Sequence, residues 1–169
     1  MLRDSVEVIE SKYPIHVDSL RVLAGSAGAG RQRGGPGEEF IFGPRFDKMT
    51  MGVAADGQVN PPLGVRGGGA AVAGATYFID VDGSERQLLG LVQTSLGPGQ
   101  RIRSIDNGGG GYGPPTERSA QLVLKDVLRG FETVERARDV YGVVLNGGVD
   151  DESLAVDEAA TATLRALTT

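Results

Sequence analysis

Apolar and polar residues alternate over the first two-thirds of the chain, and this pattern predicts short β-strands. Val6 and Val8, then Ile15 and Val17, stand between polar and charged residues, which predicts half-buried strands over residues 6–23 with a break at residues 13–14. Further strands are expected at residues 38–42, 46–53, 76–81, 85–91 and 100–105. The Asp82-Gly83 dipeptide suits a type I′ turn, so the segments on either side of it should form an antiparallel hairpin. The Gly-rich tracts at residues 24–37 and 60–75 predict loops or turns.

The pattern becomes helical after Pro115. Apolar residues then recur at intervals of three and one, which places them on one helical face: Ala120, Val123, Leu124, Val127, Leu128 and Phe131. Ser119 is suited to cap this helix and Gly130 to end it. A second helix should start from an N-cap at Thr133 and stop before Gly142. A short strand at residues 143–145 and a last helix capped by Asp157 complete the expected order.

These elements predict an α+β fold. A Gly-rich, mainly antiparallel β region over residues 1–115 is followed by two or three helices over residues 116–169. We expect the helical region to pack on the β region as one compact domain, because a chain of 169 residues has the size of an ordinary single domain.

Composition and charge narrow the classes of function. The sequence has no cysteine, which excludes disulfides, cysteine-bound zinc and a thiol nucleophile. A net charge of −5 disfavours nucleic acid and anionic membranes as partners. No apolar run reaches membrane-spanning length, and the charged N-terminal stretch is unlike a signal peptide, so we expect a cytoplasmic protein.

The stretch NGGGGYGPP, at residues 107–115, formally contains the dinucleotide-binding pattern G-x-G-x-x-G at Gly108, Gly110 and Gly113. That site needs a helix to begin at the third glycine, so that its N-terminus meets the pyrophosphate. Pro114 is held out of the helical region by the proline after it. We therefore expect a fixed, tightly turned junction between a strand and a helix, with Tyr112 as its one large side chain.

Other candidate sites are incomplete. Part of a calcium-binding loop is matched by Asp80, Asp82 and Glu85. The remaining ligands and the flanking helices are missing, so a hairpin turn is expected there. His16 is the only histidine, and no G-x-S-x-G motif accompanies it as a source of an activated serine. The sequence contains no self-sufficient catalytic constellation.

Arg31 and Arg33 lie two residues apart on a Gly-rich segment. Two guanidinium groups in this position could hold a carboxylate or a phosphate together with backbone N–H groups. The favoured alternative is that they pair with acidic residues of the chain or of a partner subunit.

A series of motifs resembles a known protein family. In chain order they are KYPIHV, GAGRQRGGPG, PPLGVRGGG, LGPGQRIRSIDNGGGGYGPPTER, LVLKDVLRGFETVERARDVYGVVL and VDEAATATLRA. Together they resemble the C-terminal region of the hydantoinase B/oxoprolinase family, which includes N-methylhydantoinase B and the large subunits of acetone and acetophenone carboxylases. The resemblance covers residues 5–167. Pro114 and Ser119 depart from the family pattern, in which aspartate is common at both positions.

The resemblance implies a role in a multi-subunit enzyme. A hydantoinase A-type subunit would bind ATP and Mg and phosphorylate the substrate's carbonyl or enol oxygen, and B-type subunits would complete the opening of a cyclic amide. The equivalent role in a ketone carboxylase and a non-catalytic assembly module are the alternatives. This chain would bind no cofactor, and any divalent metal would lie in partner subunits, since the family's metal ligands lie upstream of the matched segment.

The resemblance also bears on partners and sites. Family B subunits are much longer, so the chain is expected to be a small subunit of a split B component, or else a fragment, that works with an A-type and a larger B-type subunit and is not active alone. Catalytic residues are not assigned. The candidates for contact with substrate or with another subunit are Arg31, Arg33, Arg66, Gly109, Gly110, Gly111 and Tyr112.

Overall fold

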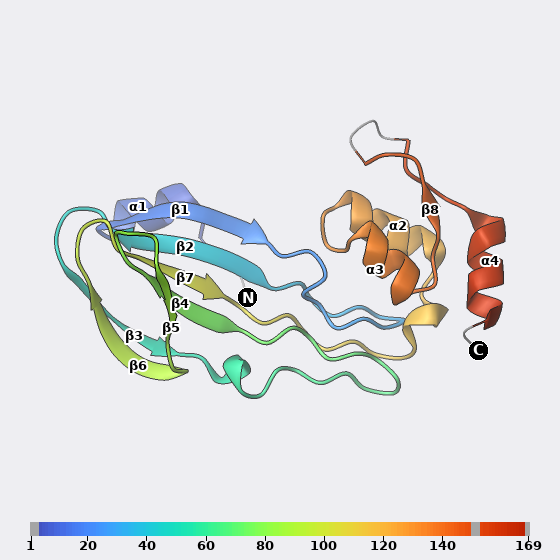
Figure 1. Cartoon of the computed structure of the whole chain (residues 1–169), viewed down its shortest axis with the longest axis horizontal. Coiled ribbons are helices and arrows are strands. Elements are labelled where there is room, and N and C mark those ends of the chain that lie inside the picture. Colours follow the sequence, from blue (N-terminus) through green and yellow to red (C-terminus); the bar gives the residue numbers. More distant parts are fainter. Residues whose placement is uncertain (1–3, 150–152, 168–169) are drawn as a thin grey trace. The chain divides into compact units, whose positions relative to one another are not determined.

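A computed structural model describes residues 4–149 and 153–167 (Figure 1). The chain divides into two compact units built from interleaved segments. Unit 1 consists of Met1–Arg21, Glu38–Asn60 and Ala73–Asp106, and unit 2 consists of Val22–Gly37, Pro61–Val72 and Asn107–Thr169. The Gly-rich tracts of the first half therefore belong with the C-terminal helices. The expected single domain with a boundary after residue 115 stays a prediction.

Unit 1 is built on antiparallel sheets. Its five-stranded sheet has the order β1 (Ile15–Val22), β2 (Glu38–Pro44), β7 (Arg101–Ile105), β4 (Ala75–Ile79) and β5 (Glu85–Gln87) (Figure 1). Strand β7 pairs antiparallel with both β2 and β4, which places Ile102 opposite Phe42 on one side and Phe78 on the other. Strands β3 (Met49–Ala54) and β6 (Leu91–Leu96) form a separate antiparallel pair, and η1 (Asp56–Gln58) follows β3. This confirms the mainly antiparallel β region.

The core of unit 1 is aliphatic with one aromatic residue. Its buried members are Val53, Phe78, Leu88, Leu96 and Ile102. The predicted hairpin of β4 and β5 is present, but its turn is not of type I′, because Gly83 has a positive φ of 83° and Asp82 does not. The Gly83 amide donates to the Asp80 carbonyl at 3.0 Å, and the Asp80 amide donates to the Ser84 carbonyl at 2.9 Å. Gly99 has a φ of 86° in the turn that leads into β7.

The first predicted strand is wrong over part of its length. Residues Val6–Lys12 form helix α1, and only Ile15–Val22 form a strand, β1. Val6 and Val8 fit a period of two, but a seven-residue segment is too short to separate that period from the helical one. The helix is held against β1 by Glu10, whose carboxylate accepts a hydrogen bond of 2.7 Å from the Val17 amide.

Unit 2 contains the helical C-terminal region. It includes η2 (Pro115–Glu117), α2 (Ala120–Leu128), α3 (Val134–Asp139), the pair β8 (Leu145–Asn146) and β9 (Ala155–Val156), and α4 (Glu158–Leu167) (Figure 1). The strand predicted at residues 143–145 lies at Leu145–Asn146 instead, so only Leu145 is shared. The helices enclose a second core, of which the buried members are Ala29, Val123, Val127, Ala137, Tyr141, Val143 and Leu154. The α+β fold with three C-terminal helices is confirmed.

The helix ends follow the predicted signals with one exception. Thr133 caps α3 by accepting a hydrogen bond from the Arg136 amide, and Asp157 caps α4 by accepting one from Ala160. Ser119 occupies the N-cap position of α2, but its side chain makes no capping bond. Gly130 ends α2 with a φ of 70°. Over residues 4–149 and 153–167, no helix has the length and apolar character needed to cross a bilayer.

Candidate functional site

Three Gly-rich segments of unit 2 are bonded to one another through their backbones. We call Val22–Gly37, Pro61–Val72 and residues 107–113 together the glycine bundle. Each segment bonds to both others, through Gly28 N to Gly109 O (2.8 Å), Gly109 N to Gly35 O (2.8 Å), Gly69 N to Ala29 O (2.7 Å), Gly111 N to Gly69 O (3.0 Å) and Val65 N to Gly111 O (2.9 Å). The tracts that the sequence predicts as loops or turns are therefore irregular segments that are hydrogen-bonded to one another.

Close backbone packing explains the glycines of the bundle. A Cβ atom on Gly34 would lie 1.9 Å from the Gly109 carbonyl oxygen, and one on Gly111 would lie 1.9 Å from that of Ala29. Real Cβ atoms do not come this close to backbone atoms, so these segments could not approach with any other residue. The Gly109 and Gly111 amides already donate hydrogen bonds to carbonyl groups of other segments, so they are not available to bind a phosphate.

The junction after the bundle has the predicted character. Pro114 has φ −59° and ψ 134°, and the next α-helix, α2, begins only at Ala120. Only the three-residue 3-10 turn η2 lies between Gly113 and α2, so no α-helix begins at Gly113, which agrees with the sequence argument against a dinucleotide-binding loop.

Tyr112 is the one aromatic side chain of the bundle, and it is 38% exposed. The guanidinium carbon of Arg31 lies 6.0 Å from the centre of its ring, and that of Arg66 lies 5.8 Å from it. Both distances are within the range of cation–π attraction. Three of the predicted candidates, each on a different segment of the bundle, are thus brought together.

Arg33 has a different environment from Arg31. Its side chain is 13% exposed and forms a two-pronged contact with Asp126 of α2, with Nε and Nη2 at 3.1 and 3.2 Å from the two carboxylate oxygens. The carboxylate also accepts bonds of 3.2 and 2.8 Å from Arg118. Of the two roles considered from the sequence, Arg33 therefore has that of pairing with an acidic residue of the chain. This pairing connects the bundle to α2.

A second ion pair of unit 2 joins the buried carboxylate of Glu132 to the half-buried Arg136. The Glu132 carboxylate, 1% exposed, accepts hydrogen bonds of 2.9 Å from the Tyr141 hydroxyl and 2.8 Å from Arg136 Nε. Burial, followed by the nearby negative charge of Glu132, raises the pKa of Tyr141 well above its usual range. Because its proton is held by Glu132 in the core, this hydroxyl is a structural donor.

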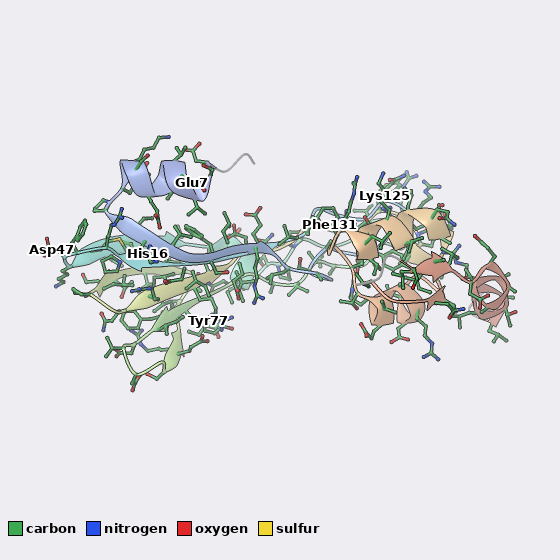
Figure 2. All side chains as sticks on the ribbon, turned by 90° about the horizontal axis from the view of Figure 1, so that it is seen from above. Glu7, His16, Asp47, Tyr77, Lys125 and Phe131 are labelled. Carbon is green, nitrogen blue, oxygen red and sulfur yellow. The ribbon has the colours of Figure 1, made fainter. Side chains whose placement is uncertain are left out.

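The other polar residues considered from sequence are paired locally. His16, on β1 (Figure 2), is half-exposed and lies 3.0 Å from Glu10 through Nδ1. Asp82 accepts a bond from the Ser84 amide within the hairpin turn, and Glu85 pairs with Arg103. Among residues 4–149 and 153–167, no three histidine, aspartate or glutamate side chains are grouped as metal ligands would be.

Unit 1 has an open apolar cleft of about 370 Å³. Its walls include Ile9 of α1, the stacked rings of Phe40 and Phe42, and Val53 and Ile102. A cleft of this kind can receive an apolar ligand or a neighbouring side chain. Its polar lining, from Thr76, Ser104 and Asp106, provides neither a basic group nor an activated nucleophile.

Sequence reasoning missed the partners of the candidate residues. Asp126 and Arg118 were not singled out, although they fix Arg33, and no sequence signal links Arg33 to a carboxylate 93 positions away. Gln32 and Val65 also flank Tyr112 through isolated backbone bridges. The exposed group that remains as a candidate site is Arg31, Arg66 and Tyr112.

The fold and the site define an α+β protein whose unit 2 contains the glycine bundle and the buried pairing of Arg33 and Arg118 with Asp126. The chain belongs to the hydantoinase B/oxoprolinase family, whose model matches residues 1–115. This confirms the resemblance found in the sequence.

Comparison with individual proteins extends the likeness to almost the whole chain. The chain is 32% identical to caprolactamase subunit beta of Pseudomonas jessenii over 170 aligned positions, which cover 98% of this chain and 28% of that protein. Its structure is similar to that of the ATP-dependent caprolactamase from the same organism, with a TM-score of 0.75, 29% identity, and 96% of this chain and 28% of that chain covered. Nucleotide-free acetone carboxylase shares the fold, with a TM-score of 0.81, 24% identity, and 98% of this chain and 26% of that chain covered. The chain thus spans about a quarter of the length of these relatives.

Proposed function

We propose that this chain forms the C-terminal part of the B-type component of an ATP-dependent complex that opens cyclic amides. The likeness to an ATP-dependent caprolactamase over 96% of the chain carries this proposal. A partner A-type subunit would use ATP and Mg to phosphorylate the amide carbonyl oxygen. Water would then add to the activated carbon, and the ring C–N bond would break as the nitrogen takes up a proton. A second water would hydrolyse the resulting acyl phosphate to the carboxylate and inorganic phosphate.

Within such a complex, the chain would act mainly through shape. The glycine bundle fixes the backbone of Arg31, Arg66 and Tyr112 without relying on mobile side chains, because Tyr112 exchanges backbone hydrogen bonds of 2.9 and 3.0 Å with Gln32. A rigid surface of this kind can line a pocket or contact another subunit with little loss of entropy. Catalytic acid–base groups, ATP and any divalent metal would be held by the partner subunits.

The same role in a ketone carboxylase is the second candidate. It is supported by the higher structural similarity to acetone carboxylase, a TM-score of 0.81 against 0.75, whereas sequence identity favours the caprolactamase, 29% against 24%. A module that only stabilises the complex is the third candidate. It is supported by the buried Arg33–Asp126–Arg118 and Glu132–Tyr141 contacts, which bind unit 2 together.

Substrate-dependent ATP turnover separates these candidates. The protein that carries this chain is expressed with an A-type and a larger B-type subunit encoded in the same genome, and ADP release is measured with lactams, with hydantoins, and with ketones plus bicarbonate. The proposal expects release that depends on a cyclic amide and yields the ring-opened acid. Turnover with ketone and bicarbonate alone would favour the carboxylase. Ring opening that proceeds unchanged without this chain would contradict both enzymatic roles.

A further inference from the structure

Most buried or half-buried arginines of the described chain are matched by a carboxylate. Arg33 and Arg118 share Asp126, Arg136 pairs with Glu132, and Arg101 pairs with Asp18. The arginines around Tyr112 differ from these. Arg31 is half-exposed and its nearest carboxylate, that of Glu117, lies 3.7 Å away, beyond hydrogen-bond distance. Arg66 is exposed and forms no ion pair with any residue in 4–149 or 153–167. Two arginines that no described carboxylate meets at hydrogen-bond distance therefore lie together around one aromatic ring.

The backbone positions of this group are fixed from three directions. Arg31 N donates to Gly113 O at 3.1 Å, and Tyr112 bonds in both directions to Gln32. Val65, next to Arg66, forms a parallel bridge with Tyr112. The two guanidinium carbons lie within 6.0 and 5.8 Å of the ring centre, so both charges are held close to one aromatic surface before any ligand arrives.

Arg66 is held in an unfavourable conformation. Its φ of 52° is the one positive value among the non-glycine residues that the structure describes, and Gly67 follows with a φ of 89°. The Gly68 amide closes this turn on the Val65 carbonyl at 3.1 Å. Two positive φ values in succession are typical of a type I′ turn, whose first position favours glycine, asparagine or aspartate. An arginine here carries a conformational cost that glycine would avoid, which is the kind of cost found at binding sites.

We propose that Arg31, Arg66 and Tyr112 form a binding site for a phosphate-type dianion. The two guanidinium groups would donate N–H bonds to its oxygens, as arginine does with phosphate. The Tyr112 hydroxyl would donate a further bond, while its ring keeps the arginines in place. The inference concerns the chain itself and does not depend on the proposed enzyme complex.

Charge decides between a dianion and a carboxylate ligand. The group carries two positive charges, and Glu117 already supplies one negative charge beside Arg31. A monoanionic carboxylate would add little to what Glu117 provides, whereas a dianion can engage both guanidinium groups and displace Glu117 from Arg31. Glu117 is thus an internal competitor, and its removal should strengthen binding.

Titration of the full chain, followed through its backbone amide NMR signals, tests the site. Inorganic phosphate at about pH 8 and sulfate serve as dianions and acetate as the monoanion, all at constant ionic strength. We expect saturable shifts at the amides of Tyr112 and Arg66 with phosphate and sulfate, and weak, unsaturated shifts with acetate. Arg31→Ala and Arg66→Gly should each weaken phosphate binding about three- to tenfold. Glu117→Gln should strengthen it about two- to fivefold.

The variants are chosen so that misfolding cannot be mistaken for loss of the site. Glycine suits the positive φ at position 66, so Arg66→Gly keeps the turn. Arg86→Ala is the matched control, because Arg86 is also an exposed arginine near an aromatic ring, 4.9 Å from the centre of Phe78, but belongs to unit 1. Equal weakening in Arg86→Ala, acetate binding as tight as phosphate, or an unchanged affinity in Glu117→Gln would overturn the proposal. None of these results bears on assembly with other subunits, so the proposed function is tested separately.

Discussion

Replacing Asp126 with asparagine should destabilise unit 2 severely while hardly changing its shape. The carboxylate is 8% exposed and accepts four hydrogen bonds, two from Arg33 and two from Arg118. Both arginines are also largely buried, with 13% and 9% of their side chains exposed. The asparagine side chain has nearly the same size, but it carries no charge and turns one acceptor into a donor.

The size of the effect follows from the two cations left behind. Removing one partner of a buried ion pair costs about 3–5 kcal/mol, because the remaining charge is desolvated without compensation. Arg33 and Arg118 each keep one bond to a backbone carbonyl, of Gly34 and Arg31, so we expect the lower end, about 3 kcal/mol. With a urea dependence of about 1.5–2 kcal/mol per molar, the unfolding midpoint should fall by about 1.5–2 M.

Urea unfolding followed by the helical circular dichroism signal measures this change, since α2, α3 and α4 all belong to unit 2. Glu117→Gln is the control within unit 2. It also removes a carboxylate that faces an arginine, Arg31, but with 53% of the Glu117 side chain exposed it should cost less than about 1 kcal/mol. If Asp126→Asn and Glu117→Gln cost the same, the reasoning from burial is refuted.

Three further changes test other parts of the structure. Gly34→Ala should prevent unit 2 from folding normally, at a cost of about 3 kcal/mol or more, because its Cβ would lie 1.9 Å from a backbone oxygen, whereas Gly35→Ala meets nothing within 4 Å and should be nearly neutral in thermal unfolding. Thr133→Ala should cost about 1 kcal/mol in the same assay, and Ser119→Ala much less, since only Thr133 makes a capping bond. The raised pKa of Tyr141 means that the folded state favours the protonated hydroxyl, so its contribution to stability is complete below about pH 10 and declines as the pH rises further. In Tyr141→Phe, the urea midpoint should therefore fall less steeply with pH above about pH 10 than in the wild type. An equal fall in both proteins would contradict the structural role of the Tyr141 hydroxyl.

Local signals in the sequence identify much of the fold correctly. The 3-1-3 spacing from Ala120 onward places Val123 and Val127 in the core of unit 2, where both are buried. The hairpin of β4 and β5 forms as expected, with Gly83 in the left-handed conformation. The expected type I′ turn is wrong, because that turn needs a positive φ at Asp82 as well. Helix α1 was missed because seven residues with two valines fit both periods.

The candidate site was less accessible to sequence reasoning. Glycine has no side chain, so the spacing of apolar residues predicts no structure over the Gly-rich tracts. The hydrogen bonds among these tracts join segments that are far apart in the chain. Arg31 and Arg33 look equivalent in sequence, yet Arg33 reaches a buried carboxylate on α2 and Arg31 stays at the surface beside Tyr112. The difference is set by tertiary packing alone. The family motifs identified the right family, but they did not distinguish these two roles.

Native mass spectrometry of the assembled proteins tests the proposed role in the complex most directly. The protein that carries this chain is co-expressed with the A-type and larger B-type subunits of the same genome, and the purified complex is weighed with the wild-type chain and with Gly34→Ala, using Gly35→Ala as the control. We predict one stable complex that contains all the components with the wild-type chain and with Gly35→Ala, and loss of the assembly with Gly34→Ala. A chain that stays monomeric beside a fully assembled, active A–B complex would contradict the account.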